Sequence, residues 1–269
     1  MLVDTHCHLD ADEFAADRAA VITRARQAGV ETIVIPSVAR ANFETVAALA
    51  RSFRGGAYAL GIHPMAVPSA QDADLECLEQ RIVAALTDPC FVAIGEIGLD
   101  FFVPELKTPD MVARQERYYS RQLDLAARYR LPVLLHVRRS QDQVLKHLRR
   151  HTGVGGIAHA FNGSFQQAGQ FIDRGFALGI GGAMTFGRAR QIRRLAARLP
   201  LDALVLETDA PDLAPAWCDA PMRGRARNEP AQLAGIGGEL ARLRGADLAS
   251  VADATARNAR RVLPRLSGH

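Results

Sequence analysis

The sequence is poor in cysteine and has no long apolar run. Its four cysteines are scattered and form no C-x-x-C pair, which argues against both a disulfide framework and a cysteine-based zinc site. No segment approaches the ~18 consecutive apolar residues of a membrane span. The first residues, Met1 to His6, lack the basic and apolar regions of a signal peptide. We therefore expect a reduced, cytoplasmic protein that does not enter a membrane.

Lysine is also almost absent. Lys107 and Lys146 are the only lysines among 33 basic residues, and the others are arginines. Arginine is suited to bidentate phosphate binding, although codon choice in a GC-rich genome gives the same excess. The net charge is only +4, which by itself does not decide whether the protein binds nucleic acid. With 48% hydrophobic and 23% charged residues, the composition is that of an ordinary globular protein.

A short apolar run followed by a longer helical pattern occurs eight times along the chain. The runs are rich in Val, Ile and Leu, as expected of strands that are buried on both faces. They cover Leu2–His8, Thr32–Val38, Tyr58–His63, Phe91–Glu96, Pro132–Val137, Gly156–Phe161, Phe176–Gly181 and Leu204–Asp209. We predict an α/β protein with one (β/α)8 TIM-barrel domain over residues 1–269, since such a barrel typically takes ~250 residues. The alternative, a doubly wound open sheet, usually has a Gly-rich first turn that is missing here.

The helical patterns between these runs have their own boundary signals. Glu13–Ala28 has apolar residues at helical spacing, and Asp110–Tyr129 is the longest such pattern. Ser140 and Ser164 precede the next two patterns and are predicted to be N-caps. Two further helices are expected between Pro230 and Leu263.

His6 and His8 lie two residues apart on the first predicted strand. Side chains alternate along a strand, so both imidazoles should point to the same face and Cys7 to the other. Two imidazoles at the C-terminal end of a strand can together bind a divalent metal. An isolated H-x-H is more often exposed or hydrogen-bonded, so this pair needs support from the rest of the chain.

Four more metal-type side chains lie in or at the ends of other predicted strands: Glu96, His136, His159 and Asp209. A buried carboxylate such as Glu96 needs a neighbouring cation. This cation could be a metal ion or, in a purely structural role, the side chain of an arginine such as Arg138. In a barrel the C-terminal ends of the strands converge on the face that carries the active site. We therefore predict that these residues form one metal centre with His6 and His8.

The number of ligands exceeds what one tetrahedral zinc with an open position requires. It fits two ions bridged by a carboxylate, and Glu96 is central in strand order. His6, His8 and Asp209 are predicted to hold one ion, because the first and eighth strands become neighbours when the barrel closes. His136 and His159 are predicted to hold the other. The nitrogen and oxygen ligands fit Zn, Mn, Co or Ni and, less naturally, Mg.

The sequence resembles the TatD family of metal-dependent deoxyribonucleases over its whole length, and within it the YjjV-like branch. The matching phrases are Asp4–Asp10 (DTHCHLD), Gly61–Pro64 (GIHP), Gly95–Asp100 (GEIGLD), Leu131–Arg138 (LPVLLHVR) and Glu207–Pro211 (ETDAP). The resemblance implies an amidohydrolase-like barrel, the same six ligands, two metal ions and phosphodiester hydrolysis, often from the 3′ end of single-stranded DNA. Two departures are Ala160, where the family commonly has cysteine, and a loop over 223–230 that is one residue longer.

We therefore expect a metal-dependent hydrolase, in particular a deoxyribonuclease of the 3′–5′ exonuclease type that uses a two-metal-activated water. Its partner would be DNA, as single strands or 3′ ends, and the chain would act as a monomer. Asp209 is predicted to transfer the proton and Glu96 to take part in catalysis as the bridging carboxylate. His63, Arg138 and Arg225 are predicted to bind substrate.

Two alternatives remain open. A dinuclear amidohydrolase-type enzyme acting on a small amide, lactone or ester would use the same ligands. A binding protein with structural metals is disfavoured by the surplus of ligands, since structural zinc sites are closed and four-coordinate. The loop aromatics Phe101, Phe102, Phe161 and Trp217 could stack on bases, or could serve local packing.

Overall fold

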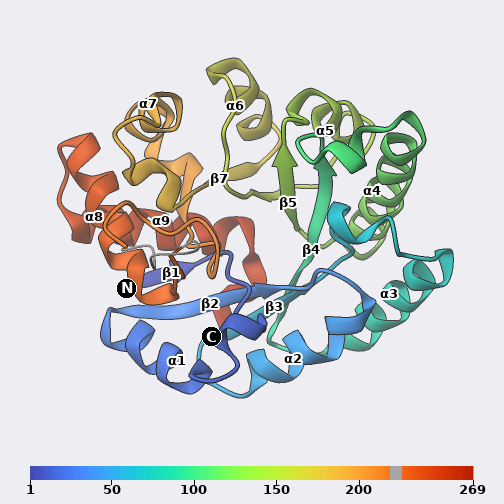
Figure 1. Ribbon diagram of the computed structural model, residues 1–269, viewed down its shortest axis with the longest axis horizontal. Coiled ribbons are helices and arrows are strands. Elements are labelled where there is room, and N and C mark those ends of the chain that lie inside the picture. Colours follow the sequence, from blue (N-terminus) through green and yellow to red (C-terminus); the bar gives the residue numbers. More distant parts are fainter. Residues whose placement is uncertain (219–225, 269) are drawn as a thin grey trace.

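The computed structural model describes residues 1–218 and 226–268 of the chain. Eight parallel strands form one sheet in which neighbours follow chain order. The strands are β1 (Leu2–Asp4), β2 (Val30–Pro36), β3 (Gly56–Leu60), β4 (Phe91–Asp100), β5 (Val133–Arg138), β6 (Gly156–Ala158), β7 (Phe176–Ile180) and β8 (Leu204–Leu206). The helices surround this sheet (Figure 1). The predicted (β/α)8 barrel is therefore confirmed.

The α-helices are α1 (Arg18–Gln27), α2 (Phe43–Arg51), α3 (Asp72–Ala85), α4 (Pro109–Tyr129), α5 (Gln141–Leu148), α6 (Phe165–Ile172), α7 (Arg190–Arg198), α8 (Leu233–Arg244) and α9 (Leu248–Val262). Short 3-10 turns are η1 (Asp12–Phe14), η2 (Arg40–Asn42), η3 (Pro64–Ala66), η4 (Pro104–Lys107), η5 (Gly182–Thr185), η6 (Leu201–Ala203), η7 (Pro230–Gln232) and η8 (Pro264–Gly268). Across the described ranges, 1–218 and 226–268, no helix is both long enough and apolar enough to cross a membrane.

The helix predictions hold except at two places. The predicted helix over Glu13–Ala28 is wrong at its start, because η1 comes first and the regular helix begins only at Arg18. Ser164 accepts a hydrogen bond from the Gln167 N–H and caps α6 as predicted. Ser140 precedes α5, but its hydroxyl donates to the Leu99 carbonyl instead of capping. Tertiary contact with β4 thus outweighs the local capping preference of this serine.

The barrel closes between its first and last strands through residues that follow both of them. The Asp209 N–H donates to the His6 carbonyl at 2.8 Å, and the His8 N–H donates to the Ala210 carbonyl at 2.8 Å. Regular pairing has ended before this point, at Asp4 in β1 and at residue 206 in β8. The predicted strands that reached His8 and Asp209 were therefore too long, and the ligands lie on short connecting segments.

β4 is longer than predicted and continues past Glu96 to Asp100. Its last residues pair with β5, where Asp100 lies opposite Arg138. Gly98 allows this pairing: its φ is +143°, and a Cβ there would lie 2.1 Å from the His136 carbonyl oxygen. The prediction ended the strand at its first charged residue, although the burial of both faces continues beyond it.

The core has one part inside the barrel and one between barrel and helices. The inner cluster takes at least one residue from each strand, mostly Val and Ala, as in Val3 and Ala177. Residues of α9 and η8, such as Ala259 and Leu266, belong to the same cluster. Side chains from all eight strands of a ring can meet only inside it, so the interior is packed and leaves chemistry to the strand ends.

Candidate metal centre

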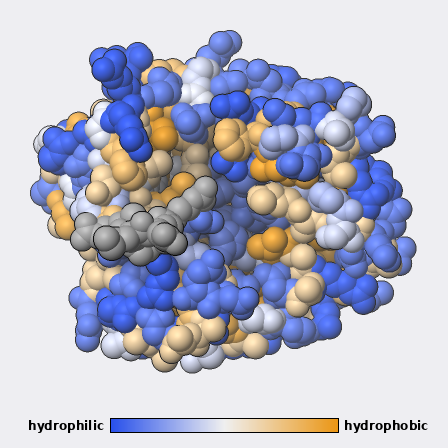
Figure 2. All heavy atoms as spheres, in the orientation of Figure 1, coloured by the Kyte–Doolittle hydropathy of each residue, from blue (hydrophilic) through white to orange (hydrophobic). Residues whose placement is uncertain are grey.

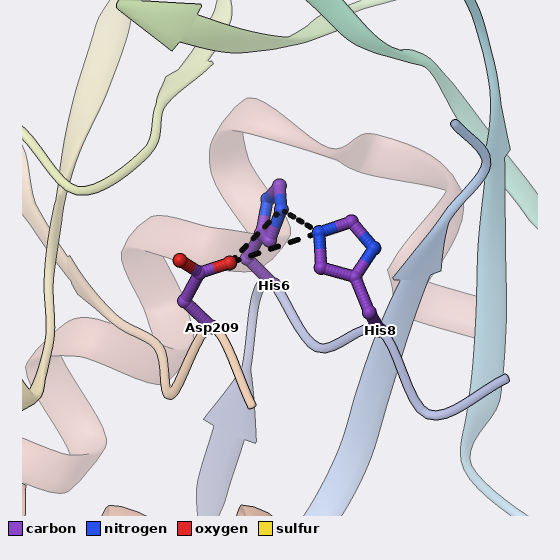
Figure 3. Close-up of side chains that lie close together, drawn as sticks. All are labelled: His6, His8 and Asp209. Atoms are coloured by element: carbon purple, nitrogen blue, oxygen red, sulfur yellow. Dashed lines mark hydrogen bonds and ion pairs between the residues drawn. The ribbon is translucent and has the colours of Figure 1, made fainter. Parts of the chain in front are cut away.

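The predicted ligands from the two ends of the chain meet at the C-terminal end of the barrel. Figure 3 shows His6, His8 and Asp209 directed toward one another from the segments after β1 and β8. The Nε2 atoms of His6 and His8 lie 3.4 Å apart, and each is 3.7 Å from Asp209 Oδ1. These three side chains form one set whose donor atoms lie within 4.8 Å of one another.

Glu96 lies at the centre of the site and divides it into two halves. Its Oε2 is 3.1 Å from His6 Nε2 and 3.5 Å from His8 Nε2. Its Oε1 is 2.9 Å from His136 Nδ1 and 3.0 Å from His159 Nε2. The structure therefore brings together all six residues that the sequence singled out as ligands, with the carboxylate in the middle.

His63 belongs to this group as well. Its Nε2 lies 3.3 Å from Glu96 Oε1, and its ring packs edge-on against the ring of His136 with 4.4 Å between centroids. The side chain is buried, and His63, Glu96 and His136 form a further set of possible ligands. Sequence reasoning assigned His63 to substrate, which stays a prediction. The signal for a ligand was present, because His63 ends its predicted strand as the other candidates do.

A second layer of carboxylates orients the imidazoles. Asp100 Oδ2 lies 3.0 Å from His136 Nε2, on the side of the ring opposite Glu96. Glu207 is fully buried, accepts a hydrogen bond from the Ala160 N–H, and has Oε1 3.5 Å from His159 Nδ1. Carboxylates in this position fix the tautomer and ring orientation of metal-binding histidines. The sequence pattern did not reveal this positioning role of the two acids.

Gly179 in β7 provides the space for Glu207. A Cβ at this position would lie 2.0 Å from Glu207 Oε2 and 2.6 Å from its Cδ. Glu207 Oε2 is buried and has no hydrogen-bond partner among the described residues. A glycine in a buried strand is otherwise unfavourable, so this one indicates close approach of a functional side chain.

Asp4 and Thr208 hold the two ligand-bearing segments together. The Thr208 N–H and hydroxyl donate to the two oxygens of Asp4 at 2.9 and 2.6 Å. Burial raises the pKa of Asp4 to about 7, against the effect of these hydrogen bonds. Next to Thr208, Asp209 has a φ of +56°, a left-handed conformation that Asp tolerates better than most residues. This backbone geometry, which the sequence pattern did not reveal, sets the direction of the Asp209 carboxylate.

The electrostatics of the centre combine a buried, ionised carboxylate with imidazoles whose pKa values shift in both directions. Burial lowers the pKa of His6 to about 3 and that of His63 to about 4. Burial alone would raise the pKa of Glu96, but the surrounding imidazoles hold it well below its usual range. Burial raises the pKa of Asp209 to about 6. For His8, the contact with Glu96 outweighs burial and raises the pKa to about 9, and contacts with carboxylates likewise outweigh burial and raise the pKa values of His136 and His159.

This donor set fits divalent metal ions. Metal ligands must be neutral imidazoles and ionised carboxylates, so binding of divalent ions here would release the protons that the imidazoles of raised pKa hold. The close approach of His6 Nε2 to His8 Nε2 directs two nitrogen lone pairs at one position, an arrangement that a cation between them stabilises. The mixture of imidazole and carboxylate ligands suits first-row divalent metals.

The centre opens into a cavity of about 1200 Å³. The face seen in Figure 2 is hollowed near its middle, with hydrophilic and hydrophobic side chains around the opening. Arg138 lines this cavity with a half-exposed side chain, and its Nη1 lies 3.8 Å from Asp100 Oδ2. Its predicted contact with substrate is compatible with this position and stays a prediction. Arg225, predicted for the same role, lies outside the described residues.

Some of the other loop residues pack or pair within the protein, and others are exposed. Phe161 is buried and packs edge-on against Phe171, which favours local packing over stacking on bases. Trp217 is exposed and donates a hydrogen bond to Gln232. Arg227, from the loop after β8, is paired with Asp17 at 2.8 Å. Phe102 is exposed and lines the cavity.

Comparison with known proteins identifies the family. The model of the family described as TatD related DNase matches residues 3–264. The chain is 40% identical to the uncharacterized metal-dependent hydrolase YjjV of Escherichia coli K12 over 259 residues, 95% of each protein. The crystal structure of YjjV superimposes with a TM-score of 0.87, covering 98% of both chains at 39% identity.

A further relative carries a more specific name. The 3′-5′ ssDNA/RNA exonuclease TatD of Cronobacter sakazakii is 35% identical over 264 residues, 97% of each protein. The resemblance seen in the sequence phrases is thereby confirmed by the family model, by a relative of nearly equal length and by the fold. This chain belongs to the TatD-related DNase family.

Proposed function

We propose that this protein is a metal-dependent deoxyribonuclease that removes nucleotides from the 3′ ends of single-stranded DNA. The observation that carries the proposal is the central position of Glu96, whose two oxygens face separate groups of imidazoles. A cluster with five histidines and two carboxylates exceeds the needs of a structural ion, which is bound by four ligands. Membership of the TatD-related DNase family supports hydrolysis of phosphodiesters.

In this proposal the ligands divide into two groups around Glu96. His6, His8 and Asp209 would hold one divalent ion. His136 and His159 would hold the second, with His63 as a further donor. The ligand types fit more than one metal, so the assay below is designed to distinguish among Zn, Mn and Mg.

Two divalent ions held by these residues would lower the pKa of a bound water and neutralise the charge that grows on the phosphate during attack. The chain supplies the remaining functions. Asp209 lines the cavity, with Oδ1 3.7 Å from His8 Nε2, and in this proposal it would accept the proton of the attacking water and return it to the leaving oxygen. Asp100 and Glu207 keep the rings of His136 and His159 in position. Burial of this layer excludes bulk water from its hydrogen bonds.

The choice of DNA rests on the cavity and on the relatives. The cavity, at about 1200 Å³, exceeds the ~300–1,000 Å³ usual for small-molecule sites, and it is open. Arg138 at its rim, and Arg225 as predicted from the sequence, would bind phosphate groups. The name of the Cronobacter relative supports attack on single strands from the 3′ end.

The test is release of nucleotides from a single-stranded oligonucleotide labelled at its 3′ end. Metal-free protein is reconstituted separately with Mg, Mn or Zn, and bound metal is measured in parallel. We expect metal-dependent release that Glu96→Ala abolishes and that Glu105→Ala, an exposed glutamate on η4, leaves unchanged. No release from DNA or RNA, with two ions per chain still bound, would reject the nuclease and favour hydrolysis of a small amide, lactone or ester.

A further inference from the structure

Phe102 is an exposed aromatic side chain held in a fixed position at the rim of the cavity. The residue is 42% exposed, while its neighbour Phe101 is partly buried and packs against the hydrophobic core. Asp100 Oδ1 accepts hydrogen bonds from the N–H groups of Phe102 at 2.8 Å and Val103 at 3.0 Å. These bonds to a buried carboxylate fix the turn after β4, so the exposure of the ring is imposed by the backbone.

Two arginines from the end of β5 lie against this ring. The Arg138 Cζ is 3.9 Å and the Arg139 Cζ is 4.8 Å from the ring centroid of Phe102. Strand pairing sets this placement, because the Phe101 N–H donates to the Arg138 carbonyl at 2.9 Å. Arg139 begins the turn after the strand, with a φ of +56°. We refer to Phe102, Arg138 and Arg139 together as the Phe102 platform.

The Phe102 platform makes the cavity electrically asymmetric. Among the described residues that line the cavity, Arg138 and Arg139 are the ones with a permanent positive charge. Asp10 and Glu13, from the segment after β1, line the cavity as well and are acidic. An anionic polymer entering the mouth is therefore attracted to the side formed by the ends of β4 and β5.

We propose that the Phe102 platform is a nucleobase-stacking subsite, in which one base of the substrate lies on Phe102 and its flanking phosphates pair with the two arginines. This inference rests on the proposed nuclease function and specifies its substrate. Stacking on an aromatic ring accepts every base, because each has a π-face, and it requires a base that is not already stacked in a duplex. The subsite thus favours single strands without selecting a sequence.

The proposal is tested with wild type, Phe102→Ala, Phe102→Leu and Phe102→Trp, each loaded with the metal that supports wild-type activity. The substrates are one single-stranded oligodeoxynucleotide and a series of its copies, each with one abasic residue at a different position from the 3′ end. A nitrophenyl phosphodiester without a base reports on hydrolysis at the metal centre. Val83→Ala, an exposed apolar residue on α3 outside the cavity, is the matched control.

We expect Phe102→Ala and Phe102→Leu to lower kcat/KM for the intact oligonucleotide about tenfold, the usual scale of one base–aromatic stack. Phe102→Trp should retain the wild-type value, because it retains the stacking surface. One abasic position should slow the wild type by a similar factor and leave Phe102→Ala unaffected. Arg139→Ala should reduce the salt dependence of kcat/KM, since each phosphate contact adds about 0.7 to the logarithmic slope for single strands.

Two results would overturn the proposal, and they differ from each other. If the wild type degrades the oligonucleotide and Phe102→Ala does so at the same rate, the nuclease stands and the stacking subsite is rejected. If the wild type hydrolyses the nitrophenyl diester and leaves every oligonucleotide intact, the nuclease function itself is rejected, and the subsite with it.

Discussion

Replacing Gly179 by alanine tests whether Glu207 organises the metal centre. The added Cβ would lie 2.0 Å from Glu207 Oε2, far inside van der Waals contact, so the carboxylate must move. Rotation of the side chain relieves the clash, but it takes Oε1 away from the Ala160 N–H and from His159. Because Glu207 is fully buried, no water replaces these partners.

The size of the effect follows from these contacts. Overpacking a buried strand costs about 1–3 kcal/mol. A buried acceptor that loses its donor adds about 1–3 kcal/mol. At about 2–4 °C per kcal/mol for a chain of 150–250 residues, we expect Tm to fall by several degrees. Loss of a carboxylate that orients a metal-binding histidine lowers metal affinity about 10–100-fold, which should reduce the metal content of the purified protein.

The assay combines thermal unfolding with metal analysis of the wild type, Gly179→Ala and the control Gly169→Ala. Gly169 lies inside α6 with nothing within 4 Å of its added Cβ, so alanine there should be neutral or stabilising. The double variant Gly179→Ala with Glu207→Asp shortens the acid and should recover part of the lost Tm. An unchanged Tm and full metal occupancy in Gly179→Ala would refute the reasoning.

Four further outcomes are expected. Asp209→Asn should retain the circular dichroism spectrum of the folded protein and lose hydrolytic activity, and wild-type turnover would reject its role in proton transfer. Gly98→Ala should lower the free energy of unfolding in urea by about 3 kcal/mol or more, since its Cβ meets the His136 carbonyl oxygen at a positive φ. Chelation should lower Tm while the far-ultraviolet spectrum persists, because the barrel core is packed without the ions, and unfolding on chelation would contradict this. Burial alone would raise the pKa of Asp88, but hydrogen bonds, including that from Tyr58, hold this pKa below its usual value. The ionised Asp88 therefore stabilises the folded protein at pH values above the pKa of the unfolded state, and this stabilisation is lost as the pH falls through the pKa of the folded state. Asp88→Asn should therefore destabilise the protein in urea at pH 7 and not at strongly acid pH, and an equal loss at both pH values would exclude this linkage.

The barrel could be predicted because short segments of the sequence are enough to identify its strands and helices. Strands that are buried on both faces are continuous apolar runs, and the chain contains eight of them with helical patterns between. Ligands at strand ends follow from the same pattern, since those ends converge whatever the details of packing. This is why His6, Glu96 and Asp209 could be placed together from sequence alone.

What the sequence did not reveal depends on contacts between distant segments. The role of Glu207 requires the space left by Gly179 on another strand. The premature end of β1 follows from bonds that Asp4 makes with the segment after β8. Ser140 has the local sequence of a cap but contacts a carbonyl of β4. Local patterns carry no information on such pairings, and a monomeric, cytoplasmic state likewise stays a prediction.

The closure of the barrel also determines when the centre can form during synthesis. His63, Glu96 and His136 are available once the first half of the chain has left the ribosome. His6 and His8, although made first, gain their fixed orientation only when the segment with Asp209 arrives and its N–H binds the His6 carbonyl. A nascent chain therefore carries only part of the proposed metal centre until Asp209 has been made, which is more than three quarters of the way along the 269 residues.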